Sequence, residues 1–301
     1  MIMENEGKIA FVLSGGGKLA STELGMLTAL VEARVRPDIV IGSSAGALIG
    51  SVFAGSPDRD GLIAVRGLWE DFLLDADLRW DVRDALARLV SRGRRRRTQR
   101  ALRSALARYL MRESFEELPV HFECVGLDMV AGREVWFDSG PLVPALLVAA
   151  AAPAIMEPVK IGDTYYCDGG VVNPFPIDRA VRLGARTIYF LQITDMERSL
   201  GFPRSLWEVG LTGMVLRWRH QKMVAGLPPD VTVHMLPVGR ADPSSGPQVL
   251  RRIMGIDLRD PYQESERRIR EAYLSTKAYL ATSAKLRYSG PAAVWQEADR
   301  D

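Results

Sequence analysis

The segment "IVIGSSAGALIG", residues 39 to 50, places Ser44 between Gly42 and Gly46 at the end of an apolar run. A serine on a sharp turn from a strand into a helix has an exposed Oγ, and flanking glycines let the two backbones approach closely. In that interpretation the segment is a nucleophile elbow, and Ser44 attacks a carbonyl carbon. An ordinary strand-to-helix turn, in which Ser43 or Ser44 caps the helix, would use the same residue types. The motif alone leaves both interpretations open.

A serine nucleophile needs a base, because a free hydroxyl is a weak nucleophile at neutral pH. The chain contains three histidines, His121, His220 and His234. The order of serine, acid and histidine in the α/β-hydrolases leaves His220 and His234 as candidates. An exposed helix face around His220 and an alternating strand around His234 explain these residues equally well. Neither histidine lies in a motif that marks it as a base.

A carboxylate held close to the serine could act as the base instead, if its position compensates for its weak basicity. Asp168, in "YYCDGGVVNPFPI", follows a short aromatic strand and precedes Gly169 and Gly170. The two glycines would let the backbone turn sharply and present the acid at a rim. A plain Asp-Gly hairpin turn is the alternative interpretation.

A glycine-rich turn, "LSGGGKLASTELG", follows the first predicted strand. Gly15-x-Gly17-x-x-Ala20 fits the loose dinucleotide-binding pattern, but the acid that such a site needs after the second strand is replaced by Gly-Ser-Ser. A P-loop is excluded as well, because Leu19 stands where a serine or threonine is required. What remains is a set of backbone N–H groups at a helix N-terminus, where negative charge is stabilised. Beside an ester carbonyl at Ser44, these donors would form an oxyanion hole.

The elements that position these residues alternate between strand and helix. Residues 8–13 and 39–41 are predicted strands, each followed by a helix, to about residue 33 and over 45–54, which is the pattern of a parallel sheet covered by helices. Further strands are predicted at 121–128, 133–138, near 159, 165–167, 187–193 and 231–237, with helices near 142–151, 175–183 and 205–225. The predicted fold class is therefore α/β, with a central, mostly parallel sheet flanked by helices.

Residues 57–115 break this alternation, because they are helical, amphipathic and charged. Seven arginines fall within a short stretch, at Arg92, Arg94, Arg95, Arg96, Arg97, Arg100 and Arg103. We interpret 57–115 as a basic helical insertion or cap. We predict a single domain over residues 1–301, with a core over about 8–240 and a C-terminal polar helix over about 261–288.

The composition is that of a globular protein, with 301 residues, 47% of them hydrophobic and 25% charged. The net charge of +2 does not indicate nucleic acid, and the arginine stretch has no aromatic platform or base-reading motif beside it. The longest apolar stretch, Val143–Met156, has 14 residues with two prolines, which is short for a membrane span. Cys124 and Cys167 have no metal-binding spacing. We expect a cytoplasmic protein with two reduced core thiols, no metal and no cofactor.

Taken together, these segments resemble the patatin-like phospholipase family. "SGGGKLASTELGML" is similar to its glycine-rich oxyanion segment, "IGSSAGAL" to its nucleophile elbow and "DGGVVNPFPIDRA" to its Asp-Gly-Gly segment. "CVGLDMVAGREVWFDSG" resembles the family's paired strands, and "VAAAAPAIMEPVKIGDTYYCDGG" its small-residue helix, proline turn and hairpin. The order and spacing match over about residues 8 to 195.

The resemblance implies a serine–aspartate dyad without histidine, on an α/β fold distinct from the common α/β-hydrolases. Ser44 would be the nucleophile and Asp168 the base. The oxyanion hole would come from the glycine-rich turn and the residue after the nucleophile, namely Gly15, Gly16, Gly17 and Ala45. The elbow and the Asp-Gly-Gly turn would be supported by Gly42, Gly46, Gly169 and Gly170. The implied activity is a lipid acyl hydrolase acting on a phospholipid or another fatty-acyl ester. Apart from the resemblance, the charge of Arg92–Arg103 would suit peripheral contact with an anionic membrane, and a solvated helix face or a mobile loop is the alternative interpretation.

One departure from the family pattern falls in the glycine-rich turn. The family usually has Gly-Gly-Gly-x-Arg/Lys-Gly, whereas Leu19 and Ala20 occupy the last two places here and the nearest cation, Lys18, is shifted by one. Loss of one hydrogen-bond donor to the oxyanion can lower the reaction rate by a factor on the order of 10²–10³. A weakly active lipid-binding or regulatory protein is therefore an alternative. An acyltransferase with the same dyad is another, because the sequence does not show whether the site admits water or a different acyl acceptor.

Overall fold

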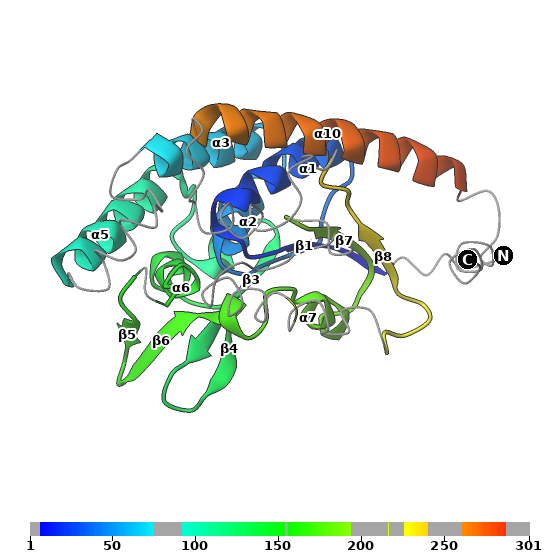
Figure 1. The fold of residues 1–301 in the computed structure, drawn as a ribbon. Coiled ribbons are helices and arrows are strands. Elements are labelled where there is room, and N and C mark those ends of the chain that lie inside the picture. Colours follow the sequence, from blue (N-terminus) through cyan, green and yellow to red (C-terminus); the bar gives the residue numbers. More distant parts are fainter. Residues whose placement is uncertain are drawn as a thin grey trace.

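The computed structural model describes residues 7–74, 92–153, 156–193, 216, 226–239 and 261–286. Its centre is one sheet (Figure 1), whose strands follow the order β5-β6-β3-β2-β1-β7-β8, and β4 pairs with β3 as a branch from this order. The strands are β1 (Lys8–Leu13), β2 (Ile39–Gly42), β3 (His121–Asp128), β4 (Arg133–Phe137), β5 (Val159–Ile161), β6 (Thr164–Asp168), β7 (Ala185–Leu191) and β8 (Thr232–Met235). The helices are α1 (Ser21–Glu32), α2 (Ala45–Gly55), α3 (Arg59–Leu74), α5 (Arg92–Tyr109), α6 (Leu142–Ala149), α7 (Ile177–Arg182) and α10 (Pro261–Leu286). Short 3-10 turns are η1 (Gly17–Ala20), η2 (Phe115–Glu117) and η3 (Gly169–Val171).

The centre of the sheet is parallel and its β4–β6 region is antiparallel. β1 pairs in parallel with β2 and β7, β2 with β3, and β7 with β8. β3 pairs antiparallel with β4 and β6, and β5 pairs antiparallel with β6. The central strands are continuous apolar runs because helices cover both of their faces. The predicted α/β class with a mostly parallel sheet is confirmed.

Alternate residues of β1 belong to two hydrophobic clusters, one on each face of the sheet. Phe11 and Leu13 pack in the larger cluster with residues of α1, α2 and α3, whereas Ala10 and Val12 pack in the smaller one with residues of α7. Successive side chains of a strand point to opposite faces, which divides the core in this way. Figure 1 shows α1, α2, α3 and α10 on one side of the sheet and α7 on the other.

The described helices of region 57–115 pack into the main core. Trp69 of α3 and Leu102 and Leu106 of α5 are buried in the larger cluster. The exposed face of α5 carries Arg97 and Arg103. Residues 75–91 and the side chains of Arg92–Arg96 lie outside the described part, and the single-domain assignment of residues 1–301 stays a prediction.

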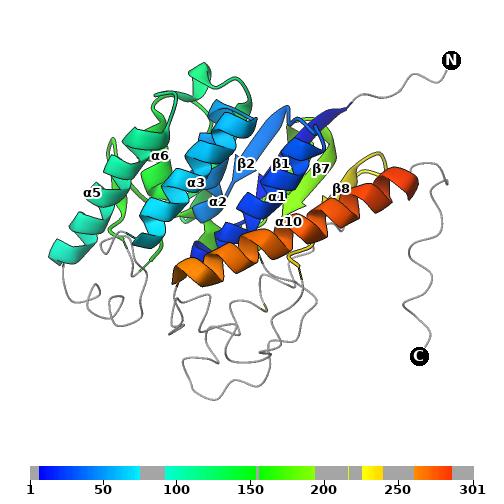
Figure 2. The same ribbon diagram turned by 90° about the horizontal axis from the view of Figure 1, so that it is seen from above.

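The C-terminal helix α10 lies along α1, although the two are far apart in sequence (Figure 2). A Cβ at Gly25 of α1 would lie 2.1 Å from the backbone oxygen of Ile269, so the absence of a side chain permits this close approach. Lys277 and Tyr273 both donate to Glu32 at the end of α1. The polar helix predicted at about 261–288 is therefore present and folds back onto the core.

Several predicted elements have ends shifted by one or two residues, and one predicted helix falls outside the described residues. The strand expected at 187–193 is β7, and it begins at Ala185 because its parallel partner β1 starts opposite that residue. The helix expected at 175–183 is shorter, since α7 begins only after Pro176. The helix expected at 205–225 lies outside the described part, apart from residue 216. Within the described residues, none of the helices has the length and apolar character needed to cross a membrane.

Candidate active site

Ser44 lies on a strained turn between β2 and α2. Its φ is 53° and its ψ is −126°, a conformation that costs a residue with a side chain about 1–3 kcal/mol. A Cβ at Gly42 would lie 2.4 Å from Ala47 Cα, and one at Gly46 would lie 2.6 Å from the carbonyl oxygen of Ser14. Both contacts are with backbone atoms, so no side-chain movement could relieve them. A side chain at either position would therefore force the backbone of the turn to shift.

The antiparallel return of β6 along β3 brings Asp168 to Ser44. Gly42 at the end of β2 pairs with Cys124 of β3, and Asp168 at the end of β6 pairs with Gly126, two residues further along β3. Ser44 also lies two residues beyond Gly42. As a result, Ser44 Oγ donates a hydrogen bond of 2.7 Å to Asp168 Oδ2. The two predicted residues, 124 positions apart in the sequence, form a buried pair.

The environment of Asp168 makes it a stronger base than an ordinary aspartate. Burial raises its pKa from 3.8 to about 6, against the opposing effects of the hydrogen bonds from Ser44 and from the N–H of Gly170. The Gly170 N–H donates to Asp168 Oδ1 at 2.7 Å, and the Asp168 N–H donates to Ala151 O at 3.0 Å. One carboxylate oxygen is thus held by the backbone, and the other faces the serine.

The glycines after Asp168 let the chain pass close to two neighbouring segments. A Cβ at Gly169 would lie 2.6 Å from the backbone of Val125 in β3. A Cβ at Gly170 would lie 3.0 Å from Asp168 Oδ1 and 3.1 Å from Ser43 Oγ. A side chain at Gly169 would push against β3, and one at Gly170 would push against the carboxylate of Asp168 and the hydroxyl of Ser43.

The glycine-rich turn packs directly against the elbow. A Cβ at Gly15 would lie 2.8 Å from Ser44 Cβ. Gly17 begins η1 and Ala45 begins α2, and the first N–H groups of a helix have no acceptor within it. The N–H of Gly15 differs from these, because it donates to Pro174 O at 3.4 Å. Gly15 was expected among the oxyanion donors, but in the structure its N–H donates to a backbone carbonyl of the protein.

The two residues that depart from the family pattern are core residues. Leu19 and Ala20 are both buried in the larger hydrophobic cluster. A cation at either position would therefore be placed among apolar side chains, where an unpaired charge is costly. The side chain of Lys18 lies outside the described part.

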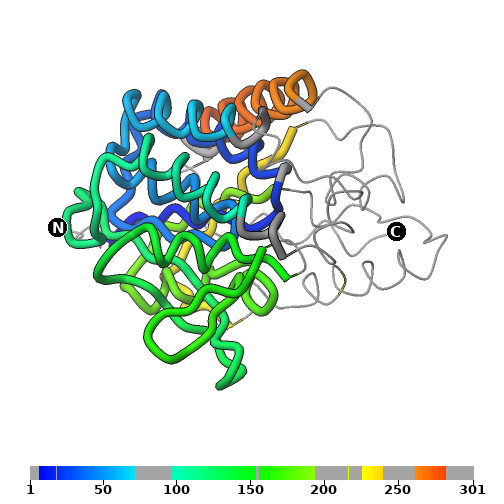
Figure 3. The backbone as a smooth tube through the Cα atoms, turned by 90° about the vertical axis from the view of Figure 1, so that its left-hand side faces the viewer, coloured from blue at the N-terminus to red at the C-terminus, as the bar shows by residue number. Residues whose placement is uncertain are grey.

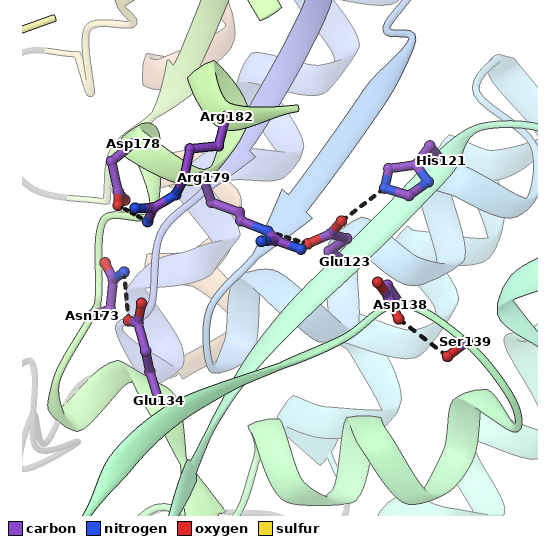
Figure 4. A network of polar contacts seen from close by, with 9 residues as sticks. All are labelled: His121, Glu123, Glu134, Asp138, Ser139, Asn173, Asp178, Arg179 and Arg182. Carbon is purple, nitrogen blue, oxygen red and sulfur yellow. Dashed lines mark hydrogen bonds and ion pairs between the residues drawn. The ribbon is translucent and has the colours of Figure 1, made fainter. Parts of the chain in front are cut away.

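The segment Asn173–Pro174 joins the three motif segments of the site. Ser43 Oγ, beside the nucleophile, donates to Asn173 O at 3.1 Å, and the Asn173 N–H donates to Gly169 O at 2.9 Å. Pro174 supplies the acceptor for Gly15. The side chain of Asn173 is itself anchored, because its Nδ2 donates to Glu134 Oε2 of β4 at 3.0 Å (Figure 4).

The sequence analysis did not identify Asn173 or Glu134. Asn-Pro directly after the Asp-Gly-Gly segment is a turn signal that could have indicated Asn173. Nothing in the sequence around Glu134 marks it, since its partner is 39 residues away. These two residues hold the loop that contacts both the elbow and the glycine-rich turn.

The described histidines take part in other contacts. His121 pairs with Glu123, which also accepts from Arg179 Nε at 2.6 Å (Figure 4). His121 lies opposite Ile39 at the start of β2, whereas Ser44 follows the end of that strand. His234 stacks on Tyr189, and its Nδ1 lies 3.0 Å from a tyrosine hydroxyl of α10. His220 is outside the described residues.

Comparison with known sequences identifies the family to which the chain belongs. Residues 11–181, more than half of the chain, match the family model for patatin-like phospholipases. The chain belongs to the patatin-like phospholipase family. The match includes the elbow, the glycine-rich turn and the Asp-Gly-Gly segment of this patatin-like chain.

Individual relatives of this patatin-like chain are distant. An uncharacterized NTE family protein from Mycobacterium tuberculosis is 27% identical over 170 residues, which cover 56% of this chain and 44% of the relative. A putative patatin-like phospholipase domain-containing protein from Caenorhabditis elegans is 29% identical over 189 residues, covering 62% of this chain and 17% of the relative. The chain thus spans less than half the length of either protein. Among solved structures, VipD from Legionella pneumophila matches with a TM-score of 0.48 and 15% identity, over 91% of this chain and 67% of that one.

Proposed function

We propose that this patatin-like chain hydrolyses carboxylic esters of lipids through an acyl-enzyme on Ser44, with Asp168 as the general base. The observation that carries this proposal is the 2.7 Å hydrogen bond from Ser44 Oγ to Asp168 Oδ2. A nucleophile and a base within hydrogen-bond reach are the minimal arrangement for covalent catalysis by a serine.

In the first half of the reaction, Ser44 Oγ attacks the ester carbonyl carbon and its proton passes to Asp168 Oδ2. The tetrahedral intermediate then collapses, the bond from carbon to the alcohol oxygen breaks, and protonated Asp168 gives its proton to that oxygen. In the second half, water attacks the acyl-enzyme and gives a proton to Asp168. The bond to Ser44 breaks, the proton returns to Ser44 Oγ, and the fatty acid leaves.

The oxyanion of both tetrahedral intermediates would be stabilised by backbone N–H groups of Gly16, Gly17 and Ala45. Gly17 and Ala45 begin helical turns, so their N–H groups have no acceptor within the turn, and Gly16 directly precedes η1. Donors aimed at a developing negative charge are often the largest single contribution to catalysis. No metal or cofactor is needed for these steps.

The proposed substrate class is a phospholipid or another fatty-acyl ester, and α5 would contact an anionic membrane. Arg97 and Arg103 are exposed on this helix, opposite the buried residues Leu102 and Leu106. Each cation near an anionic surface contributes about 1 kcal/mol to binding. The proposed location is the cytoplasm, with peripheral contact at the membrane.

Labelling by a fluorophosphonate, followed by intact-mass measurement, tests the dyad. The parent protein should gain one adduct, Ser44→Ala should gain none, and Asp168→Asn should react about 10²-fold or more slowly. Asp163→Asn is a matched control, because Asp163 is an exposed acid on the same hairpin and should leave the rate unchanged. Absence of labelling in the parent would contradict an activated serine and favour a lipid-binding protein.

A labelled parent should then be assayed on lipid esters with and without an added alcohol. Release of free fatty acid is expected, since water is the acceptor in the proposed reaction. Transfer of the acyl group to the alcohol in preference to water would contradict hydrolysis and identify an acyltransferase that uses the same dyad.

A further inference from the structure

Exposed apolar side chains gather at the outer ends of two neighbouring hairpins. Met129 and Val130, in the turn between β3 and β4, are 50% and 78% exposed, and Tyr165 of β6 is 48% exposed. The N–H of Met129 donates to Tyr165 O at 3.0 Å, so the three side chains come from adjoining backbone. We call these three residues the tip cluster. Figures 1 and 3 show the two hairpins projecting on the side of the sheet away from α10.

The turn between β3 and β4 is closed by its own hydrogen bonds. Asp128 Oδ1 accepts from the N–H groups of Val130 and Ala131, each at 2.9 Å, and the Gly132 N–H donates to Asp128 O at 2.9 Å. Gly132 takes a positive φ of 66°, as a tight turn requires. None of these bonds uses the side chain of residue 129 or 130, so polar residues would serve the turn equally well. Two consecutive apolar side chains at an exposed turn therefore need another explanation.

The tip cluster lies at the same end of the sheet as the dyad. β3 runs parallel to β2, so the carboxyl end of β3 points the same way as the elbow that follows β2. Asp168 pairs with Gly126, and the turn begins just beyond Asp128, two residues further along the same strand. The cluster is thus joined to the catalytic carboxylate by a short, hydrogen-bonded piece of sheet.

The charges around the tip cluster include two cations. Lys160 Nζ of β5 lies 5.9 Å from the centre of the Tyr165 ring, and Arg133 is exposed at the start of β4. Asp163, in the turn between β5 and β6, is an exposed carboxylate in this region. The carboxylate of Asp128 is buried and accepts hydrogen bonds from the backbone of the turn. Apolar residues at a tip with cations near their base suit the surface of a phospholipid bilayer.

We propose that the tip cluster inserts into the interface of a phospholipid bilayer and anchors the active site at its substrate, an inference that rests on the proposed lipid-ester function. A bilayer fits this surface better than a protein does. A stable protein interface buries about 800 Å² on each partner, which a convex turn does not offer. Insertion into lipid needs only a few side chains, because transfer of one aliphatic side chain changes a partition coefficient by about tenfold or more.

The test is co-sedimentation of the full chain with sucrose-loaded vesicles of phosphatidylcholine and phosphatidylglycerol, in a ratio of about 4:1, so that the surface is anionic. Ser44→Ala is the background, because it prevents hydrolysis during the assay. The tip variant Met129→Ser/Val130→Ser should lower the partition coefficient by about tenfold or more. The matched control is Ile63→Ser/Leu274→Ser, which removes two aliphatic side chains that are 63% and 52% exposed on α3 and α10. The partition coefficient of the control should stay within about twofold of that of the background, because the apolar area that it removes lies outside the proposed contact with lipid.

Vesicle binding at high salt distinguishes insertion of the tip cluster from electrostatic attraction by the arginines of α5. At 1 M salt the screening length is about 3 Å, so binding by exposed cations is lost, whereas the difference between the tip variant and its background should persist. Unchanged partitioning of the tip variant, equal loss in the control, or no vesicle binding by the background would each overturn the anchor.

The same substitutions in the chain that retains Ser44 distinguish failure of the anchor from failure of the proposed function. A water-soluble short-chain ester needs no bilayer, so the tip variant should hydrolyse it at the parental rate. Loss of that activity would show that the tip supports the site rather than the membrane contact, and would overturn the anchor. If the parent itself hydrolyses no ester, the proposed function fails, while vesicle binding still decides whether the tip enters lipid.

Discussion

Asp168→Asn should separate the stability of this protein from its activity. The substitution keeps the size and shape of the side chain but removes the buried charge that acts as the base. Burial raises the pKa of Asp168 from 3.8 to about 6, so the folded protein holds the neutral form more tightly than the unfolded chain does. At neutral pH the carboxylate is ionised in both states, and its burial therefore opposes folding.

The magnitude follows from the change in pKa. At about 1.36 kcal/mol per pKa unit, the rise corresponds to about 3 kcal/mol of stability lost at pH 7 relative to a neutral side chain. This loss is present above pH 6, decreases as the pH falls through 6, and is absent below 3.8, where both states are protonated. Asparagine is neutral throughout, so the variant should be more stable than the parent by about 2–3 kcal/mol at pH 7 and by little at pH 4.

Activity should change in the opposite direction. Loss of a general base costs about 10²–10⁴ in rate, and the parent should label faster as the pH rises through about 6, where Asp168 becomes ionised. The assay is chemical denaturation of both proteins at pH 7 and pH 4, with fluorophosphonate labelling from pH 5 to 8. A variant less stable than the parent at pH 7, or one that labels at the parental rate, would refute the reasoning.

Other predictions concern the parts that surround the dyad. Gly46→Ala should lower the free energy of unfolding by about 1–3 kcal/mol, measured by denaturation, because its Cβ would lie 2.6 Å from a backbone oxygen; parental stability would contradict this. Asn173→Ala and Glu134→Ala should lower kcat for a soluble ester by about tenfold with little change in KM, as one lost hydrogen bond of about 1.4 kcal/mol would. Glu134→Gln keeps the acceptor and should restore kcat, and a failure to do so would refute positioning through Asn173. Arg97→Glu/Arg103→Glu should reduce binding to anionic vesicles at low salt by about tenfold or more, as co-sedimentation would show, and equal binding would contradict contact through α5.

The strands and their alternation could be predicted because the pattern is local. A strand buried on both faces is a short apolar run, as in residues 8–13 and 39–41, and glycine marks backbone positions where no Cβ fits. The same local logic placed β3 and α10 within about two residues of their ends. Ends set by a partner strand or by a neighbouring proline, such as those of β7 and α7, were shifted because that information lies elsewhere in the chain.

The sequence by itself determined the serine, the acid and the glycines as candidates, because their spacing and order are properties of the chain. The residue types alone left open whether Asp168 or a histidine serves Ser44, and the family resemblance implied Asp168. Only the return of β6 along β3 brings the two residues together, since 124 residues separate them. Tertiary structure also decided the pKa of Asp168, which depends on burial, and the hydrogen bond that engages Gly15. The exposure of Met129 and Val130 also became known only from the tertiary structure, because the sequence does not show whether two consecutive apolar residues lie in the core or at an exposed turn.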